Sequence, residues 1–392
     1  MMNDTKKYFI NILSSFLNNT SPATPDNIDW EELYKIANIH SLTAIAANQI
    51  MLLPAEKQPP KNILTKFKQQ LGYTLISYNN KDKIVSRISS TFENNKIPFI
   101  FVKGTCLREL YPIKELRTSG DIDIYVKDKD FAVGRQLLID LGYNLIIDNT
   151  NICEYEIGKE LIELHSESDY DNIYFSNIFE HADKITPYEY RLNLEEHLLF
   201  VLMHIAKHMG SYGAGVRMFM DIDVIIRKID NFNYDKFIKK CEENNISVLA
   251  KTAFSLCNLW FNTPVKSEHN FYTDSNFNTS FISTVIDGGS FGYQTRNTGD
   301  YYISNNISSN GKITFITKIR AILQMFFPKK EILQNQFKYC KKHPVLLPIA
   351  WIHKIINGIC KNSKHSWSTI NRIAKADSSA ADYAELIKEL EL

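Results

Sequence analysis

The chain has 392 residues, of which 44% are hydrophobic and 12% are aromatic, so it is not wholly disordered. Its length allows two or three packed units, because a single core stops growing at about 250 to 300 residues. Lysine and arginine total 45 and acidic residues total 44, a formal net charge of +1 that excludes a positive field over the whole chain. We therefore expect no membrane partner and no long nucleic acid, and local groups must hold any polyanion that binds.

The six cysteines form no CxxC pair, so neither a zinc knuckle nor a redox dithiol is predicted. The first apolar segment, YFINILSSFL, follows two lysines as in a signal peptide, but polar residues interrupt it and no AxA site follows. We expect an amphipathic helix there. The apolar runs are much shorter than the roughly 20 residues of a membrane span, so we expect a cytoplasmic protein.

Residues 1–83 are predicted to form an N-terminal helical region. Asp29 and Glu32 have the spacing of a capping box at the start of a helix. The segment MLLPAEKQPPKN breaks the helical pattern, and a further helix then leads into the next region.

Residues 84–190 alternate short strands and helices. Strand patterns occur in IPFIFV, DIDIYV, YNLIID, ICEYEI and LIELH, whereas CLRELY and FAVGRQLLIDLG have helical patterns. The predicted fold class is therefore α+β: a small mixed β-sheet with helices on one face, inserted between N-terminal and C-terminal helical regions.

The helical period returns over residues 191–261, which we expect to form a helical domain. Residues 262–312 are rich in Asn, Ser, Thr, Gly and Tyr and are predicted to be a long loop region, either a binding loop or a partly mobile one. Residues 313–392 form a C-terminal helical region in this prediction.

Alternation places Asp121 and Asp123 on one face of the strand DIDIYV, and Glu163 and His165 on one face of LIELH. Carboxylates two residues apart on a strand lie about 6 to 7 Å apart and repel by about 2.5 kcal/mol at an effective dielectric of about 20. A hard divalent cation removes this penalty, so we expect Mg²⁺, or Mn²⁺ in its place, at Asp121, Asp123 and Glu163. The alternative is that the two aspartates form the solvated face of an edge strand.

The strand before this one ends in KGT, which places Gly104 and Thr105 at the start of a short helix. Backbone N–H groups and the helix dipole favour a phosphate at such a position. Lys103 and Arg117 flank it, and we expect both cations to bind the phosphates of the nucleotide. A phosphate site beside metal-binding carboxylates is typical of proteins that bind a nucleoside triphosphate. In the alternative interpretation, neither cation binds a ligand, and Lys103 is only the last residue of a strand.

The combined pattern resembles the nucleotidyltransferase superfamily related to DNA polymerase beta. Within it, FVKGTCLRELYP, LRTSGDIDIYV, IELHSE and the later EEHLLFVLMHIAKH resemble an uncharacterised bacterial nucleotidyltransferase-like family with the pattern KG…LYP…R…DIDxxV. The resemblance covers most of the chain and is weakest over residues 262–312. One departure is that the superfamily usually has Gly-Ser where this chain has Gly104 and Thr105, although the hydroxyl is retained.

This resemblance implies that Gly104 and Thr105 bind the triphosphate, that Asp121 and Asp123 coordinate Mg²⁺, and that Glu163 is the third carboxylate. It implies Mg²⁺-dependent transfer of a nucleotidyl group to an acceptor hydroxyl or phosphate, with release of pyrophosphate. The acceptor could be a small molecule, a protein side chain or an RNA end. Two alternatives are a catalytically inactive nucleotide-binding or toxin/antitoxin-like regulatory module, and a phosphotransferase that releases a nucleoside diphosphate.

Several histidines are further candidates. His197, His204 and His208 fall on one helical stripe, and the HxxxH spacing of the last two could hold zinc, but no glutamate follows as in HExxH. We expect His165, His204 and His208 instead to line a groove near the nucleotide or acceptor.

A second DID motif, Asp221 to Asp223, lies in a segment of helical periodicity. Its two carboxylates point about 200° apart on a helix, so they cannot chelate one ion together. Arg217 and Asp221 have the spacing of a same-face ion pair, and the family resemblance adds Asp221 to the candidate groove.

Overall fold

The computed structural model divides the chain into two compact units, which are described separately. Unit 1 comprises Met1–Ala206 and Gly215–Thr273, and unit 2 comprises Lys207–Ala214 and Asp274–Leu392. The residues that the structure describes are 2–25, 27–169, 173–268, 275–307, 312–330, 332–333, 337, 339–340, 343–360, 363–376 and 378–392.

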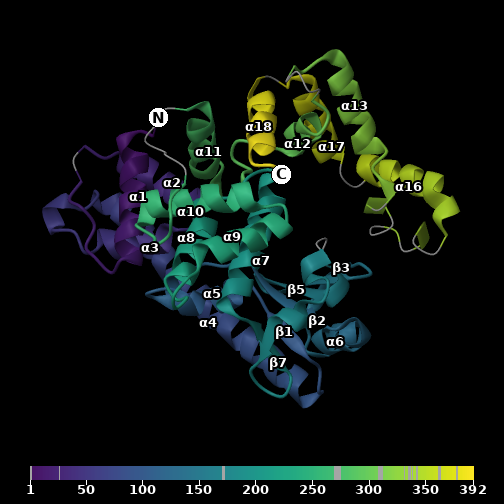
Figure 1. The fold of residues 1–392 in the computed structure, drawn as a ribbon, viewed down its shortest axis with the longest axis horizontal. Helices are drawn as coiled ribbons and strands as arrows, with labels where there is room; N and C mark the ends of the chain where they lie inside the picture. The colour runs from purple at the N-terminus through teal and green to yellow at the C-terminus, as the bar shows by residue number, and fades with distance from the viewer. Residues whose placement is uncertain are drawn as a thin grey trace. The chain divides into compact units, whose positions relative to one another are not determined.

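Unit 1 begins with four helices (Figure 1): α1 (Asp4–Leu17), α2 (Trp30–Ile39), α3 (Thr43–Ile50) and α4 (Lys61–Asn94). Helix α1 confirms the predicted first amphipathic helix. The N-cap half of the capping box predicted for α2 is confirmed, because Asp29 Oδ1 accepts hydrogen bonds from the backbone N–H groups of Glu31 and Glu32 at 3.0 Å. The reciprocal half is replaced, because the Asp29 N–H donates to Thr5 Oγ1 at 3.4 Å. Helix α4 continues across the expected boundary between residues 83 and 84, with buried apolar residues near both of its ends.

A seven-stranded mixed sheet follows, with the strand order β3-β4-β5-β2-β1-β7-β6. Strand β2 lies in its middle, antiparallel to β1 and parallel to β5. The strands are β1 (Phe99–Phe101), β2 (Asp121–Val126), β3 (Asn144–Asp148), β4 (Ile152–Ile157), β5 (Glu160–Ser166), β6 (Ala182–Lys184) and β7 (Glu189–Leu192). The α+β class and the predicted flanking helical regions are confirmed.

Strands β6 and β7 were not predicted. They have three and four residues, too few for an alternating pattern to be distinguished from a loop. Their place in the sheet depends on long-range pairing, because β7 runs parallel to β1 and β6 then pairs antiparallel with β7.

One face of the sheet forms a hydrophobic core with α4 and with α6 (Phe131–Asp140), as the alternating pattern requires. The fully buried members from β2 and β5 are Ile122, Ile124, Val126, Ile162 and Leu164. The opposite face is partly covered as well, by α7 (Leu194–Met209), which corrects the expectation of helices on one face only. Phe200 of α7 makes an edge contact with Tyr125 of β2 at a centroid distance of 6.2 Å.

The loops around this core follow their predicted positions. Helix α6 ends before Gly142, which adopts a φ of 86° that favours glycine. Gly158 and Lys159 connect β4 to β5 as a two-residue turn, so that Ile157 pairs with Glu160. Such a turn fixes the register of the hairpin.

Three further helices described in unit 1 are α8 (Val216–Ile226), α9 (Tyr234–Glu243) and α10 (Ser247–Phe261). Every residue of α8 is buried, including both carboxylates of the second DID motif. Between Gly104 and Leu107 lies the short helix α5, directly after β1.

Unit 2 contains helices where a long loop region was predicted for residues 262–312, and that prediction is wrong for α11 (Asn276–Asp287) and α12 (Thr298–Ser304). Ser275 and Asn297 cap these helices, and a capping box joins Asn297 to Asp300, so polar residues that indicated a loop start helices instead. Residues 269–274 and 308–311 of that prediction lie outside the described residues.

Other α-helices of unit 2 in the described residues are α13 (Phe315–Phe326), α16 (Leu347–Cys360), α17 (Ser363–Ala374) and α18 (Ser378–Glu389). Across both units, the described helices include none with the length and apolar character to cross a membrane.

A buried lysine of α4 holds the two residues that precede β2 in place. Lys81 Nζ donates to the backbone oxygens of Ser119 and Gly120 at 2.6 and 3.0 Å, and lies 3.2 Å from Glu160 Oε2. Burial lowers the pKa of Lys81 below its usual value, and the Glu160 carboxylate opposes that shift. The ion pair therefore ties α4 to the residues that precede Asp121 and to the start of β5.

We predict that Lys81→Met lowers the free energy of unfolding by about 3 kcal/mol, because it leaves Glu160 buried without its cation. Chemical denaturation provides the measurement. The control is Lys66→Met on the same helix, whose ion pair with Glu31 is exposed and should contribute less than about 1 kcal/mol. Equal losses for the two variants would contradict the anchoring role of Lys81.

Candidate active site

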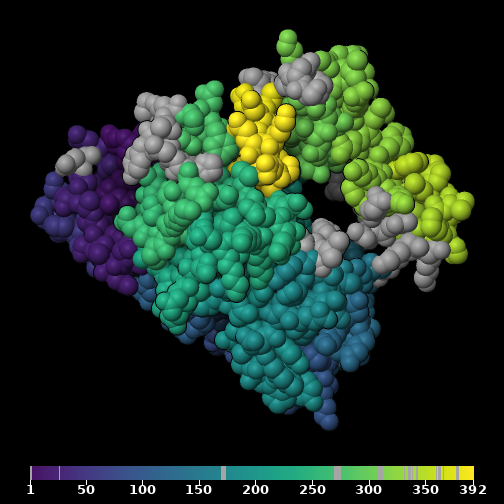
Figure 2. Space-filling view, viewed as in Figure 1, coloured from purple at the N-terminus to yellow at the C-terminus, as the bar shows by residue number. Residues whose placement is uncertain are grey.

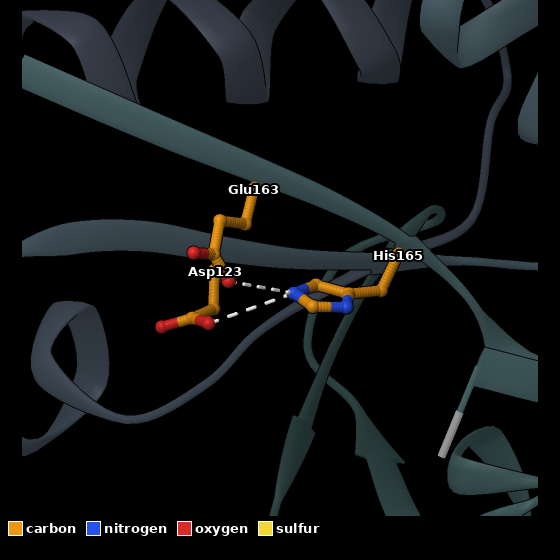
Figure 3. Close-up of side chains that lie close together, drawn as sticks. All are labelled: Asp123, Glu163 and His165. Carbon is orange, nitrogen blue, oxygen red and sulfur yellow. Dashed lines mark ion pairs between the residues drawn. The ribbon is translucent and has the colours of Figure 1, made fainter. Parts of the chain in front are cut away.

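Three potential metal ligands meet where β2 and β5 run side by side. The register pairs Asp123 with Glu163, and His165 follows two residues later on the same face. His165 Nε2 lies 3.3 Å from Glu163 Oε2 and 3.6 Å from Asp123 Oδ1 (Figure 3). One ligand atom from each residue lies within 4.8 Å of the other two. The sequence had assigned Asp121, Asp123 and Glu163 as ligands, so His165 enters this group in place of Asp121.

Asp121 remains close to this group. It precedes Asp123 by two residues on the same strand, so the two side chains point to the same face of the sheet. Burial raises the pKa of Asp121 above its usual value, and the Asp123 carboxylate raises it further, while Lys103 opposes both effects. Asp121 therefore stands in the electrostatic field of the cluster, although its oxygens are outside the three-residue group.

The cluster has an internal cation. Lys103 Nζ donates to Asp123 Oδ1 at 2.6 Å. Burial alone would lower the pKa of Lys103, but Asp123, Asp121 and Glu163 together raise it above its usual value. Burial would likewise raise the pKa of Asp123, but Lys103 and His165 hold it well below its usual value. Part of the repulsion that the sequence predicted for these carboxylates is therefore already compensated by Lys103.

The donor atoms nevertheless fit a divalent cation. Asp123 is 1% exposed, and its Oδ2 atom has no hydrogen-bond partner among the residues that the structure describes. A buried carboxylate oxygen without a donor is costly unless something binds it. Asp123 and Glu163 supply oxygen ligands of the kind that Mg²⁺ and Mn²⁺ prefer, and His165 adds a nitrogen that Mn²⁺ accepts more readily than Mg²⁺ does.

A further carboxylate, Glu154, was missed from the sequence. On β4 it lies directly opposite Glu163, so a row of acidic residues crosses three adjacent strands at Asp123, Glu163 and Glu154. Burial raises the pKa of Glu154, and the Glu163 carboxylate adds to the shift. The signal was present in the sequence, because counting back from the predicted Gly158–Lys159 turn pairs residue 154 with residue 163.

The turn between β1 and α5 lies beside these carboxylates. Lys103 adopts a positive φ of 50°, which is unusual for a residue with a side chain, and its N–H donates to His197 Nε2 of α7 at 3.2 Å. The next two N–H groups, those of Gly104 and Thr105, have no partner in the part of the chain that the structure describes. They are therefore available to an anion.

Glycine is required at position 104 by close packing. A Cβ atom there would lie 2.4 Å from Arg117 Nη1 and 2.7 Å from Ser119 Cβ. The side chain of Arg117 therefore lies against the α-carbon of Gly104, and any larger residue would push the turn away from β2.

Arg117 and Asp221 form a buried ion pair. Arg117 Nε and Nη2 donate to Asp221 Oδ1 and Oδ2 at 3.1 and 2.7 Å, and the Tyr111 hydroxyl donates to Oδ1 at 2.7 Å. The expected pair between Arg217 and Asp221 is replaced by this one, since Arg217 Nη1 donates to Thr118 instead. Arg117 is thus bound to α8, and Asp221 lies behind the glycine turn rather than in a groove.

The two aspartates of the second DID motif have separate partners, as the helical periodicity predicts. Asp223 accepts hydrogen bonds from Arg227 and from the hydroxyl of Thr263, whereas Asp221 binds Arg117. His204 and His208 lie on α7, and His208 is tilted against Phe291 at a centroid distance of 5.2 Å. Within the described residues, the three-ligand group includes neither of these histidines.

His197 should affect stability through its protonation. Burial lowers the pKa of His197 from 6.5 to about 4, so between these values the unfolded chain binds a proton that the folded chain does not. We predict that acidification through this window lowers the free energy of unfolding of the wild type, relative to His197→Gln, by about 1.4 kcal/mol per pH unit. Denaturation at several pH values measures the difference, with the exposed His343→Gln as control. Parallel curves for wild type and His197→Gln would exclude this role.

Comparison with known proteins agrees with the geometry of the site. No curated protein matches the chain. A family model described as uncharacterised nucleotidyltransferase matches residues 26–262, a span that includes the carboxylate cluster, the turn at Gly104 and the ion pair behind it. Because the match covers more than half of the sequence, the chain belongs to this family of nucleotidyltransferase enzymes.

Proposed function

We propose that this nucleotidyltransferase moves a nucleotidyl group from a nucleoside triphosphate to an acceptor hydroxyl or phosphate. In the reaction, an acceptor oxygen forms a bond to the α-phosphorus, the α–β phosphoanhydride bond breaks, and pyrophosphate leaves. The main support is the pairing of Asp123 with Glu163 across β2 and β5, beside a turn with two available N–H groups. Both halves of a triphosphate site are then adjacent.

Asp123 and Glu163, with His165 or Asp121 beside them, would hold Mg²⁺ or Mn²⁺. When bound, such an ion offsets the charge of the phosphate oxygens. Lys103 keeps Asp123 ionised and therefore ready to act as a ligand. The same ammonium has three N–H donors, of which the described contact with Asp123 uses one, so the others can reach a phosphate oxygen.

The phosphates would lie against the turn. The N–H groups of Gly104 and Thr105 are oriented by the His197 contact to Lys103 and by the packing of Arg117 against Gly104. We assign Arg117 a positioning role, because its guanidinium is already paired with Asp221.

Glu163 would receive the proton of an acceptor hydroxyl. It is less buried than Asp123, which leaves it open to a substrate, and His165 at 3.3 Å can orient its carboxylate. His165 is itself held by stacking on Tyr125 at a centroid distance of 4.6 Å. The acceptor would be a small molecule, a protein side chain or an RNA end.

We predict that Asp123→Asn lowers pyrophosphate release by at least about 100-fold, because the amide removes the charge that positions both the cation and Lys103. The assay uses each of the four nucleoside triphosphates with Mg²⁺ and a panel of acceptors. Asp183→Asn, an exposed change on β6, is the matched control and should leave the rate unchanged. Unaltered transfer by Asp123→Asn would refute the proposal, provided that circular dichroism shows both variants folded.

The products of the wild type distinguish the alternatives. Release of a nucleoside diphosphate instead of pyrophosphate would indicate a phosphotransferase. Metal-dependent nucleotide binding by calorimetry, with no product from any acceptor in the panel, would favour the inactive binding or toxin/antitoxin-like module.

Glu154 should tune metal affinity. We predict that Glu154→Gln raises the Mg²⁺ concentration for half-maximal activity about tenfold and leaves the rate at saturating Mg²⁺ nearly unchanged, because it removes a negative charge opposite Glu163. The control is Glu156→Gln on the same strand, which is exposed and pairs with Leu161. A loss of rate that saturating Mg²⁺ does not restore would show instead that Glu154 is an essential ligand.

A further inference from the structure

The charge of the chain is strongly uneven. Residues 312–375 contain thirteen lysine and arginine residues and a single acidic residue, Glu331. Because the whole chain has a net charge of only +1, the rest of it is acidic. The described part of this basic segment contains helices α13, α16 and α17 of unit 2, drawn from green to yellow-green and yellow (Figure 2).

Helix α13 exposes a stripe of large apolar side chains. Phe315 is 77% exposed and Ile316 is 60% exposed, and the stripe continues one and two turns later at Ile319 and Leu323. The buried residues of this helix, Thr317 and Ala321, lie on its opposite side. The exposed stripe is thus not the face that packs against the rest of unit 2.

Helix α16 repeats this arrangement. Ile349, Ile352 and Ile356 follow one another at helical spacing and are each more than half exposed, while Ala350 is buried on another side. The preceding Val345 is 89% exposed, and Trp367 of α17 is 68% exposed. Helices α13, α16 and α17 contact one another, so these residues belong to adjacent elements.

The segment that carries the apolar stripes also carries exposed cations. From the same segment, the exposed residues with positive charge are Lys312, Arg320, Lys329, Lys330, Lys364 and Lys375. We call the two stripes and these cations the basic apolar surface. Monomeric soluble proteins rarely expose apolar patches of this kind unless something binds them.

We propose that the basic apolar surface binds the headgroup region of an anionic lipid bilayer, with α13 and α16 lying in the plane of the interface. A bilayer surface satisfies both features at once, because acyl chains accept isoleucine and phenylalanine while anionic headgroups attract lysine and arginine. A second copy of this chain that docked through the same surface would bring like charges together. An RNA would neutralise the cations but would leave the aliphatic stripes in water.

The test measures co-sedimentation of the full-length protein with vesicles of phosphatidylcholine and phosphatidylglycerol at a ratio of 3:1, and with vesicles of phosphatidylcholine alone. We expect binding to the anionic vesicles only, weakened about tenfold when salt is raised from about 0.1 to 0.5 M. The double variant Ile352→Ser/Ile356→Ser should bind at least about tenfold more weakly, because both side chains leave the apolar layer.

The matched control is Ile76→Ser on α4, where the isoleucine is 59% exposed compared with 58% for Ile352. This control should bind as the wild type does. The proposal is overturned if the protein ignores both vesicles, if Ile76→Ser and the double variant lose binding equally, or if single-stranded RNA binds more tightly than the vesicles. It is also overturned if the protein is a dimer by light scattering that the double variant converts to a monomer.

Discussion

The ion pair between Lys103 and Asp123 is the interaction on which the site depends. It joins the turn after β1 to the carboxylate in the middle of β2, at an N–O distance of 2.6 Å. The pair fixes the positions of two groups that the chemistry needs: an ionised aspartate and a turn with available N–H groups. It also means that the apo protein tolerates its acidic cluster, because part of the charge is already balanced inside the fold.

Other buried polar contacts hold this pair in place from behind. Arg117 lies against Gly104 and is bound on its far side by Asp221 of α8, and His197 of α7 holds the strained backbone of Lys103. Lys81 secures the residues that lead into β2. The helical region that follows the sheet is therefore part of the support of the site, since removing any of these partners would leave a buried charge or donor unpaired.

Local sequence patterns predicted much of this arrangement. Strict alternation placed Asp123, Glu163 and His165 on one face of their strands, and the glycine turn was predicted from its position between a strand and a helix. The pattern could not identify the partner of Arg117, because Asp221 is 104 residues away and no local signal connects the two. The sequence pattern also predicted that Lys103 binds a phosphate, whereas in the structure the Lys103 ammonium donates to Asp123. Local alternation predicts the face on which a side chain lies, but the partner of a buried charged side chain comes from elements that are distant in the sequence.

Whole-chain averages concealed a second property. The net charge of +1, on which the expectation of no membrane partner was based, sums an acidic part and a strongly basic segment. The proposal of a lipid-binding surface rests on that segment. The polar segment before it was misassigned for a related reason, because composition does not show which serine or asparagine caps a helix.

The turn at Gly158 and Lys159 has one more consequence. The two-residue loop sets the register of the hairpin, and a slip of β5 by one position against β4 would exchange the two faces of the strand. Glu163 and His165 would then point into the hydrophobic core, and Ile162 and Leu164 would point to the face that carries the acidic cluster. The two-residue turn, with Gly158 at a φ of 61°, thus helps to determine which side chains of β5 join the acidic cluster.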